Sequence, residues 1–132
     1  MEDICLANRK FNFWFYHVSH CEALIRSSKD KNFDKNIDIY FGAIKYIEIP
    51  EIIYGLEFEE AKDEDVLYLC EKIGKAVSHE DVKVLISGGR RFYVVAPIIE
   101  IMENTLELME LPFCTPIKGK GSYYPCVLCD KE

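Results

Sequence analysis

Three cysteines towards the end of the chain have the spacing that most resembles a metal-binding pattern. Cys126 and Cys129 are separated by two residues, and Cys114 precedes them. Two thiolates at this spacing on a turn can bind one zinc ion, with Cys114 as a third ligand and a fourth supplied by the fold. The sequence contains no second CxxC pair, which would complete such a set. We therefore predict no cofactor, and we keep a small zinc-binding module that uses these three cysteines as the alternative.

Two other motifs could support chemistry, and each has a simpler interpretation. His17, His20 and Cys21 bring imidazole and thiol groups near one predicted hairpin. Neighbouring residues on a strand point to opposite faces, so His20 and Cys21 would not meet as a nucleophile pair. The stretch Ser87–Arg91 contains two glycines, as phosphate-binding loops do, but it lacks the Walker lysine and a following helix. Neither motif predicts catalysis, so we expect the chain not to be an enzyme.

Acidic residues are concentrated in two parts of the chain. Residues 57–71 contain seven acids and a single base, Lys62, while residues 98–111 contain four acids and no base. A concentrated acidic face can steer and hold a cationic partner, although an ordinary solvated surface can have the same composition. We predict that the partner-binding residues are Glu57, Glu59, Glu60, Asp63, Glu64 and Asp65.

Composition and charge limit the classes of protein to which the chain can belong. Its 132 residues, 49% of them hydrophobic, are enough for a single domain, in which we expect residues 112–132 to be an extended or irregular tail. Sixteen basic against 23 acidic residues give a net charge of −7, which disfavours a nucleic-acid binder. No apolar run predicts a signal peptide or a membrane-spanning helix, so we expect a cytoplasmic protein with reduced cysteines and no membrane contact. The sequence leaves the oligomeric state open.

The first half of the chain is predicted to be mostly β-strand. Alternating aromatic residues in Phe11–His17, followed by His20–Ser27, predict a hairpin. A polar loop leads into a further series of strands. In these strands the apolar positions switch to the opposite face at Tyr46–Ile47. This switch indicates either a β-bulge or burial on both faces. The last of them, Ile53–Ala61, is predicted to be one strand with Tyr54 on its inner side.

One amphipathic helix and one tight hairpin follow in the second half. Apolar residues recur at helical spacing through residues 63–77, and Asp63 is the predicted N-cap. The runs Val82–Ser87 and Arg90–Ala96 are apolar and rich in β-branched residues. The Gly88-Gly89 pair between them suits the positive φ angles of a tight primed turn, so these runs predict a β-hairpin.

Residues 98–111 are compatible with two structures. Ile98–Met102 and Thr105–Leu111 can form a pair of short strands, which we favour, but the apolar positions also fit the stripe of a helix. With that preference the fold class is α+β. We predict a mainly antiparallel sheet of about six to eight strands, built from hairpins and a meander, with one packed amphipathic helix.

Several stretches together resemble a family of small bacterial proteins. The stretches are the run His20–Ser27, Ile39–Gly42 with Tyr46 and Pro50, the pair Gly55-Leu56, and Tyr93–Ala96. This pattern is similar to that of small uncharacterised bacterial proteins, some of which are encoded near polymorphic toxins and are thought to act as immunity proteins. The resemblance spans residues 11–110, implies a β-rich fold with a helix, and carries no functional residue over to this chain.

The acidic clustering and the resemblance lead to one functional expectation. We expect a non-enzymatic cytoplasmic interaction protein, of immunity type, that binds a cationic toxin through an acidic face. The zinc-binding module described above is the alternative.

Overall fold

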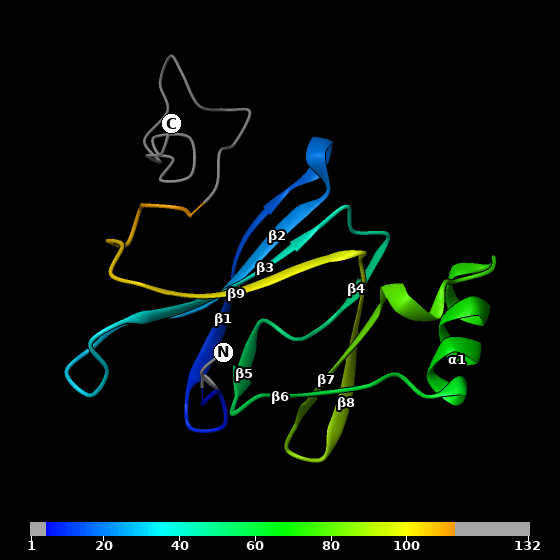
Figure 1. Ribbon diagram of the computed structural model, residues 1–132, viewed down its shortest axis with the longest axis horizontal. Coiled ribbons are helices and arrows are strands. Elements are labelled where there is room, and N and C mark those ends of the chain that lie inside the picture. Colours follow the sequence, from blue (N-terminus) through cyan, green and yellow to red (C-terminus); the bar gives the residue numbers. More distant parts are fainter. Residues whose placement is uncertain (1–4, 113–132) are drawn as a thin grey trace.

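The computed structural model describes residues 5–112, which form two antiparallel sheets and one α-helix (Figure 1). The first sheet has the strand order β5-β1-β2-β3-β9 and the second has the order β4-β8-β7-β6. This architecture confirms the predicted α+β class with mainly antiparallel strands. The elements are β1 (Lys10–His17), β2 (Glu22–Ser27), β3 (Asn36–Gly42), β4 (Tyr46–Glu48), β5 (Ile52–Tyr54), β6 (Glu57–Glu59), α1 (Asp63–Ile73), β7 (Val82–Ser87), β8 (Arg90–Val95) and β9 (Ile98–Asn104), with short 3-10 turns at η1 (Val18–His20) and η2 (His79–Asp81).

The predicted strand Ile53–Ala61 is in fact two strands, β5 and β6, which belong to different sheets. The chain changes sheet at Gly55, whose φ of 73° is a left-handed conformation that glycine adopts without strain. A Cβ at Gly55 would lie 2.6 Å from the carbonyl oxygen of Ala7, so the close approach also requires glycine. Tyr54, predicted to face inwards, is 70% exposed because it precedes this change of direction.

The bulge considered at Tyr46–Ile47 is wrong, because β4 pairs with β8 without a shift of register, and the change of phase follows a change of sheet. The chain leaves β3 in the first sheet after Gly42 and enters β4 in the second sheet at Tyr46. Ala43, between the two strands, has a φ of 56°. The register shift that the structure does contain lies in β1, between Phe13 and Phe15.

The molecule has three layers, and the second sheet is the middle one. Its inner residues, such as Leu85 and Val94, pack against Phe11, Ile25 and other residues of the first sheet. Its other face packs against α1 through a second cluster. Burial on both faces explains why β7 and β8 have apolar residues on both of their sides. The second cluster consists of Leu69, Val82, Val84, Tyr93 and Val95.

The helix α1 is confirmed but is shorter than predicted. Its apolar stripe, centred on the fully buried Leu69, faces the second sheet. The N-cap is Lys62, and the predicted N-cap Asp63 is the first helical residue. The helix ends at Ile73 because Gly74 takes a φ of 86° and donates its N–H to the carbonyl of Cys70 at 2.8 Å. This left-handed glycine cap overrides the apolar spacing that continues beyond it.

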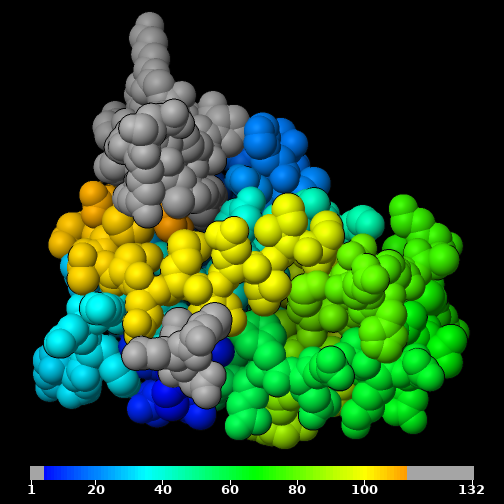
Figure 2. Space-filling model, viewed as in Figure 1, coloured from blue at the N-terminus to red at the C-terminus, as the bar shows by residue number. Residues whose placement is uncertain are grey.

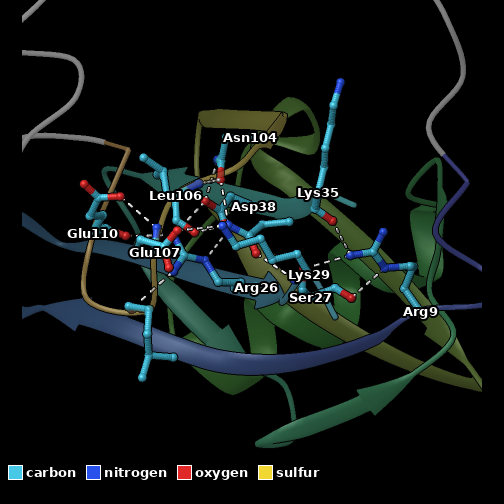
Figure 3. Close-up of polar contacts among 12 residues, drawn as sticks. Arg9, Arg26, Ser27, Lys29, Lys35, Asp38, Asn104, Leu106, Glu107 and Glu110 are labelled. Atoms are coloured by element: carbon cyan, nitrogen blue, oxygen red, sulfur yellow. Dashed lines mark hydrogen bonds and ion pairs between the residues drawn. The ribbon is translucent and has the colours of Figure 1, made fainter. Parts of the chain in front are cut away.

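Residues 98–111 form one strand instead of the predicted two. Ile98–Asn104 is β9, which pairs with β3 over its whole length. The predicted strand Thr105–Leu111 is wrong, because these residues leave the sheet and cross its outer face as an irregular segment (Figure 3). We call residues 105–111 the crossing segment. Asn36 donates to the carbonyl of Leu106 at 2.9 Å, and at the end of the segment Leu111 forms a single β-bridge.

A buried ion pair holds the crossing segment in place. Arg26 on β2 donates to both carboxylate oxygens of Asp38 on β3, at 2.6 and 3.0 Å, and the two side chains are 1% and 0% exposed. The same guanidinium donates to the carbonyl of Glu110 at 2.9 Å, and Asn104 donates to Asp38 at 2.8 Å (Figure 3). Trp14 lies beside the guanidinium, with its ring centre 5.3 Å from Cζ. The pair therefore has the extra hydrogen bonds that a buried charge requires.

Candidate functional site

The predicted partner-binding acids separate into two that form ion pairs, Asp65 and Glu59, and four that form none within the described chain. Asp65 is 4% exposed and Glu59 forms an ion pair with Arg91. The remaining four are exposed and form no ion pair with any residue of the described chain, 5–112. These four are Glu57, Glu60, Asp63 and Glu64.

Asp65 is the centre of a network that joins α1 to the second sheet. Arg91 on β8 donates to its two carboxylate oxygens at 3.1 and 2.6 Å, and Tyr93 donates to it at 2.8 Å. The backbone N–H of Lys62 donates a fourth bond at 2.8 Å, which satisfies one of the free amides at the start of the helix. We infer that Asp65 attaches the helix to the sheet and is not available to a partner.

The Asp65 network shifts the pKa values of its members in opposite directions. Burial alone would raise the pKa of Asp65, but the hydrogen bonds from Arg91, the Lys62 backbone and Tyr93 together hold that pKa below its ordinary value. Hydrogen bonds to Asp65 and Glu59 raise the pKa of Arg91. Burial, followed by the bond to Asp65, raises the pKa of Tyr93. At neutral pH the network consists of two carboxylates, one guanidinium and one neutral phenol.

An open cleft of about 590 Å³ lies beside this network. One side is formed by β6 and the chain that leads from it into α1, and the other side by η2 and β7. Apolar side chains line part of the cleft, among them Phe58, Val82, Val84 and Ile99. Polar side chains supply the rest of the lining, and these are Glu59, Glu60, His79, Glu80 and Lys83.

Two hydrogen bonds fix the polar side chains on one side of the cleft. His79 Nε2 lies 2.9 Å from the carbonyl oxygen of Ala61, and since a carbonyl only accepts, Nε2 carries the proton. Lys83 Nζ donates to the carbonyl of Glu80 at 2.7 Å. Because this ammonium binds a backbone oxygen, it leaves the Glu80 carboxylate without an ion pair among residues 5–112.

The charge and shape of the cleft suit one kind of ligand. Three glutamates and one lysine, Lys83, line the cleft; Glu59 is paired with Arg91, which leaves the carboxylates of Glu60 and Glu80 without an ion pair among residues 5–112. The apolar part of the lining can cover the aliphatic stem of a lysine or arginine, while the carboxylates accept hydrogen bonds from its charged end. The volume lies within the range of ordinary ligand sites, about 300–1,000 Å³, and is large enough for more than one side chain.

A second polar cluster on the same sheet was not predicted from the sequence. Glu48 accepts a hydrogen bond from Tyr46 at 2.7 Å and from Tyr68 at 2.9 Å. The bond to Glu48 is the main cause that raises the pKa of Tyr46 to about 12 and also raises that of Tyr68. The rings of Tyr68 and Tyr93 lie 5.3 Å apart, so this cluster continues into the Asp65 network and supports the packing of α1.

The histidine and hairpin motifs adopt simple local structures. Ser19 Oγ lies 3.2 Å from His17 Nδ1 and 3.3 Å from His20 Nδ1, which places the two rings around one turn. Cys21 has a left-handed φ of 52°, and its thiol lies 3.7 Å from the carbonyl oxygen of Val18. The Gly88-Gly89 pair forms the predicted hairpin turn with positive φ at both glycines.

The predicted zinc ligands Cys114, Cys126 and Cys129 lie outside the described residues. Within residues 5–112, no three His, Cys, Asp or Glu side chains come together in an arrangement that could hold a metal ion. The single α-helix of this range, with 11 residues, is too short to cross a membrane.

Comparison of the chain with protein-family models, with curated proteins and with solved structures gave no match.

Proposed function

We propose that this chain is a non-enzymatic cytoplasmic interaction protein whose acidic cleft binds a basic segment of a partner protein. The carboxylates of Glu60 and Glu80, which line a partly apolar cleft without ion-pair partners among residues 5–112, are the observation that carries this proposal. Unpaired carboxylates beside an apolar surface favour lysine and arginine side chains over other ligands. The net charge of −7 would add long-range attraction for a basic partner.

We further propose that the partner is a bacterial toxin, which the chain inhibits as an immunity protein does. The resemblance of residues 11–110 to such proteins supports this partner class, and the acidic cleft supports a cationic target. Inhibition would follow if the acids covered basic residues that a toxin uses on its substrate. Of the residues first predicted, Glu59 and Glu60 line the cleft, and Glu57, Asp63 and Glu64 are exposed on the adjoining segments. Asp65 is buried and is therefore not part of the proposed interface.

Co-expression with the proteins encoded by neighbouring genes tests this proposal. We expect one of them to be toxic when expressed alone, to be neutralised when this chain is present, and to co-purify with it as a stable complex. Full toxicity of every such neighbour in the presence of this chain would remove the immunity proposal.

Matched charge reversals test whether the cleft is the binding site. Glu60→Lys combined with Glu80→Lys should abolish protection, because the two carboxylates of the cleft that form no ion pair within residues 5–112 become ammonium groups. Glu51→Lys combined with Glu71→Lys makes the same change in net charge at exposed positions outside the cleft. Retained protection by the second variant and loss by the first would support the site. Equal loss in the two variants would show that only net charge matters.

A further inference from the structure

The edge strand β9 differs from the other three sheet edges of the described chain. The edge strands β4, β5 and β6 have three residues each, whereas β9 has seven. All seven pair with β3, from Asn104 opposite Asn36 to Ile98 opposite Gly42, without a shift of register. In an antiparallel strand, alternate residues direct their N–H and C=O groups away from the neighbouring strand. Within residues 5–112, no further strand takes up the outward groups of β9.

The edge strand β9 is protected only by acidic charge, that of Glu100 and Glu103. Natural sheets guard such edges with lysines, prolines, bulges or very short strands. The sequence of β9, IIEIMEN, contains no lysine, arginine or proline, and its pairing with β3 is free of bulges. Such an edge is suited to the addition of an extended segment, in which main-chain hydrogen bonds supply much of the affinity.

The charges and position of β9 indicate what kind of segment it would accept. Glu100 and Glu103 are exposed, and the first residue of the strand, Ile98, is 44% exposed. The next residue, Ile99, lines the acidic cleft, so the strand edge and the cleft are continuous. In Figure 2 residues 98–104 (yellow) form part of the surface and border the green segments. Glu100 and Glu103 favour lysine or arginine on the added strand.

A second copy of the chain is a poorer occupant than a basic segment. Pairing β9 with its own copy would gather four glutamates at one junction, because each copy brings Glu100 and Glu103. Each copy also has a net charge of −7. Like charges on adjacent strands are destabilising, so self-pairing is opposed both locally and at long range.

We infer that β9 binds an extended basic segment of the partner by strand addition, with one end of that segment reaching the acidic cleft. This inference rests on the proposed function, since it specifies the conformation of the basic partner. The added strand would extend the first sheet from five strands to six. Glu100 and Glu103 lie on opposite faces of the strand, so basic side chains on one face of the added segment would lie near Glu100 and those on the other face near Glu103. A further basic residue would enter the cleft beside Glu60.

The probe is a seven-residue peptide of valine and lysine that is matched in length to β9 and has a lysine on each face of the extended chain. Fluorescence anisotropy of the labelled peptide measures its affinity for the intact protein at low salt. A second peptide has the same side chains but N-methylated central amides, which cannot donate to a strand edge. We expect the methylated peptide to bind at least about tenfold more weakly, because it loses main-chain hydrogen bonds. Equal affinities of the two peptides would overturn strand addition.

Amide hydrogen exchange locates the bound peptide. We expect the unmethylated peptide to slow exchange at alternate residues of β9, since those amides acquire partners, while amides of the exposed hairpin tip Gly88-Gly89 remain unchanged. Binding without added protection in β9 would also overturn the inference.

Two further results separate this inference from the proposed function. In one result, the two peptides bind with equal affinity, and Glu60→Lys with Glu80→Lys weakens the binding of both to the same extent. The cleft then binds basic chains, and strand addition is wrong. Sedimentation of the protein without peptide is expected to show a monomer. A dimer that dissociates when Glu100→Lys and Glu103→Lys are introduced would show that the edge is occupied by a second copy, which contradicts the inference.

Discussion

The carboxylates of Asp65 and Glu60 belong to one acidic stretch but lie in opposite environments. Asp65 is 4% exposed and accepts hydrogen bonds from Arg91 and Tyr93. Glu60 is exposed at an open cleft and has no ion-pair partner among residues 5–112. The difference arises because β8 places the guanidinium of Arg91 beside Asp65, where it forms an ion pair. A carboxylate that has a fixed cation stabilises the fold, and one that lacks a cation remains available to a partner.

The pair Arg26–Asp38 is the extreme case of the stabilising kind. Both side chains are almost completely buried, and the guanidinium also binds carbonyls of the crossing segment. The Asp65 network is intermediate, because the side chain of Arg91 is 29% exposed. Burial thus decreases from Asp38 to Asp65 to Glu60, and the expected effects of substitution on stability should decrease in the same order.

The largest effect is expected at Asp38. Asp38→Leu should lower the free energy of unfolding by about 3–5 kcal/mol, because it leaves the buried Arg26 without its counter-charge. Urea denaturation followed by circular dichroism measures the change. Asp34→Leu, at an exposed position that forms no ion pair within residues 5–112, is the control, and its effect should stay within about 0.5 kcal/mol. Similar losses for the two variants would contradict the assignment of Asp38.

A smaller effect with a characteristic pH dependence is expected at Asp65. Asp65→Asn should cost about 1–3 kcal/mol at neutral pH, since Arg91 loses its charged acceptor. The pKa of Asp65 is lower in the folded state than in the unfolded state. The stability that its carboxylate contributes is therefore present above the unfolded-state pKa of about 3.9 and is lost as the pH falls through the folded-state pKa. Denaturation curves measured from pH 7 down to about pH 2 should therefore converge for the two proteins. A constant difference over this range would show that the charge of Asp65 is not responsible.

The tyrosine cluster should respond in the alkaline range. Tyr46→Phe should cost about 0.5–1.5 kcal/mol at neutral pH by removing the hydrogen bond to Glu48. The folded-state pKa of Tyr46 is raised to about 12. The stability that its hydrogen bond to Glu48 contributes is therefore present below the unfolded-state pKa of about 10 and is lost as the pH rises towards 12. Tyr16→Phe, at an exposed position, is the matched control. Ultraviolet titration of the tyrosines should show one fewer late-titrating group in Tyr46→Phe, and an unchanged titration would contradict the cluster.

The smallest effect on stability is expected in the cleft. Glu60→Gln and Glu80→Gln should each change the free energy of unfolding by no more than about 0.5 kcal/mol, because neither carboxylate has an ion-pair partner within residues 5–112. Thermal or urea denaturation measures this change. A loss above about 2 kcal/mol would show that these acids belong to the stabilising network and not to a binding site.

The sequence predicts local structure well in this protein because local structure depends on near neighbours. The alternation in β1, the helical spacing in α1 and the Gly88-Gly89 turn all lead to the observed elements. The change of sheet at Gly55 was missed, because apolar alternation continues through it and only the glycine marks it. The crossing segment was also missed, since its conformation depends on Arg26, which lies 84 positions before the carbonyl of Glu110 that it binds.

The candidate site could be predicted only in part. The density of acids in residues 57–71 indicates an acidic surface but does not distinguish Glu60 from Asp65. That distinction requires the pairing of β7 with β8, which places Arg91 on the face that carries α1. Glu80 was missed because it lies outside the acidic stretch in sequence and reaches the cleft only through the turn η2.

The dissociation constant of the complex with the proposed basic partner, measured by calorimetry for three proteins, tests the central claim most directly. These proteins are the wild type, Glu60→Lys with Glu80→Lys, and Glu51→Lys with Glu71→Lys. We predict that the cleft variant binds at least about tenfold more weakly than the control variant, although the two have equal net charge. Equal dissociation constants for the two variants would show that the cleft is not the binding site.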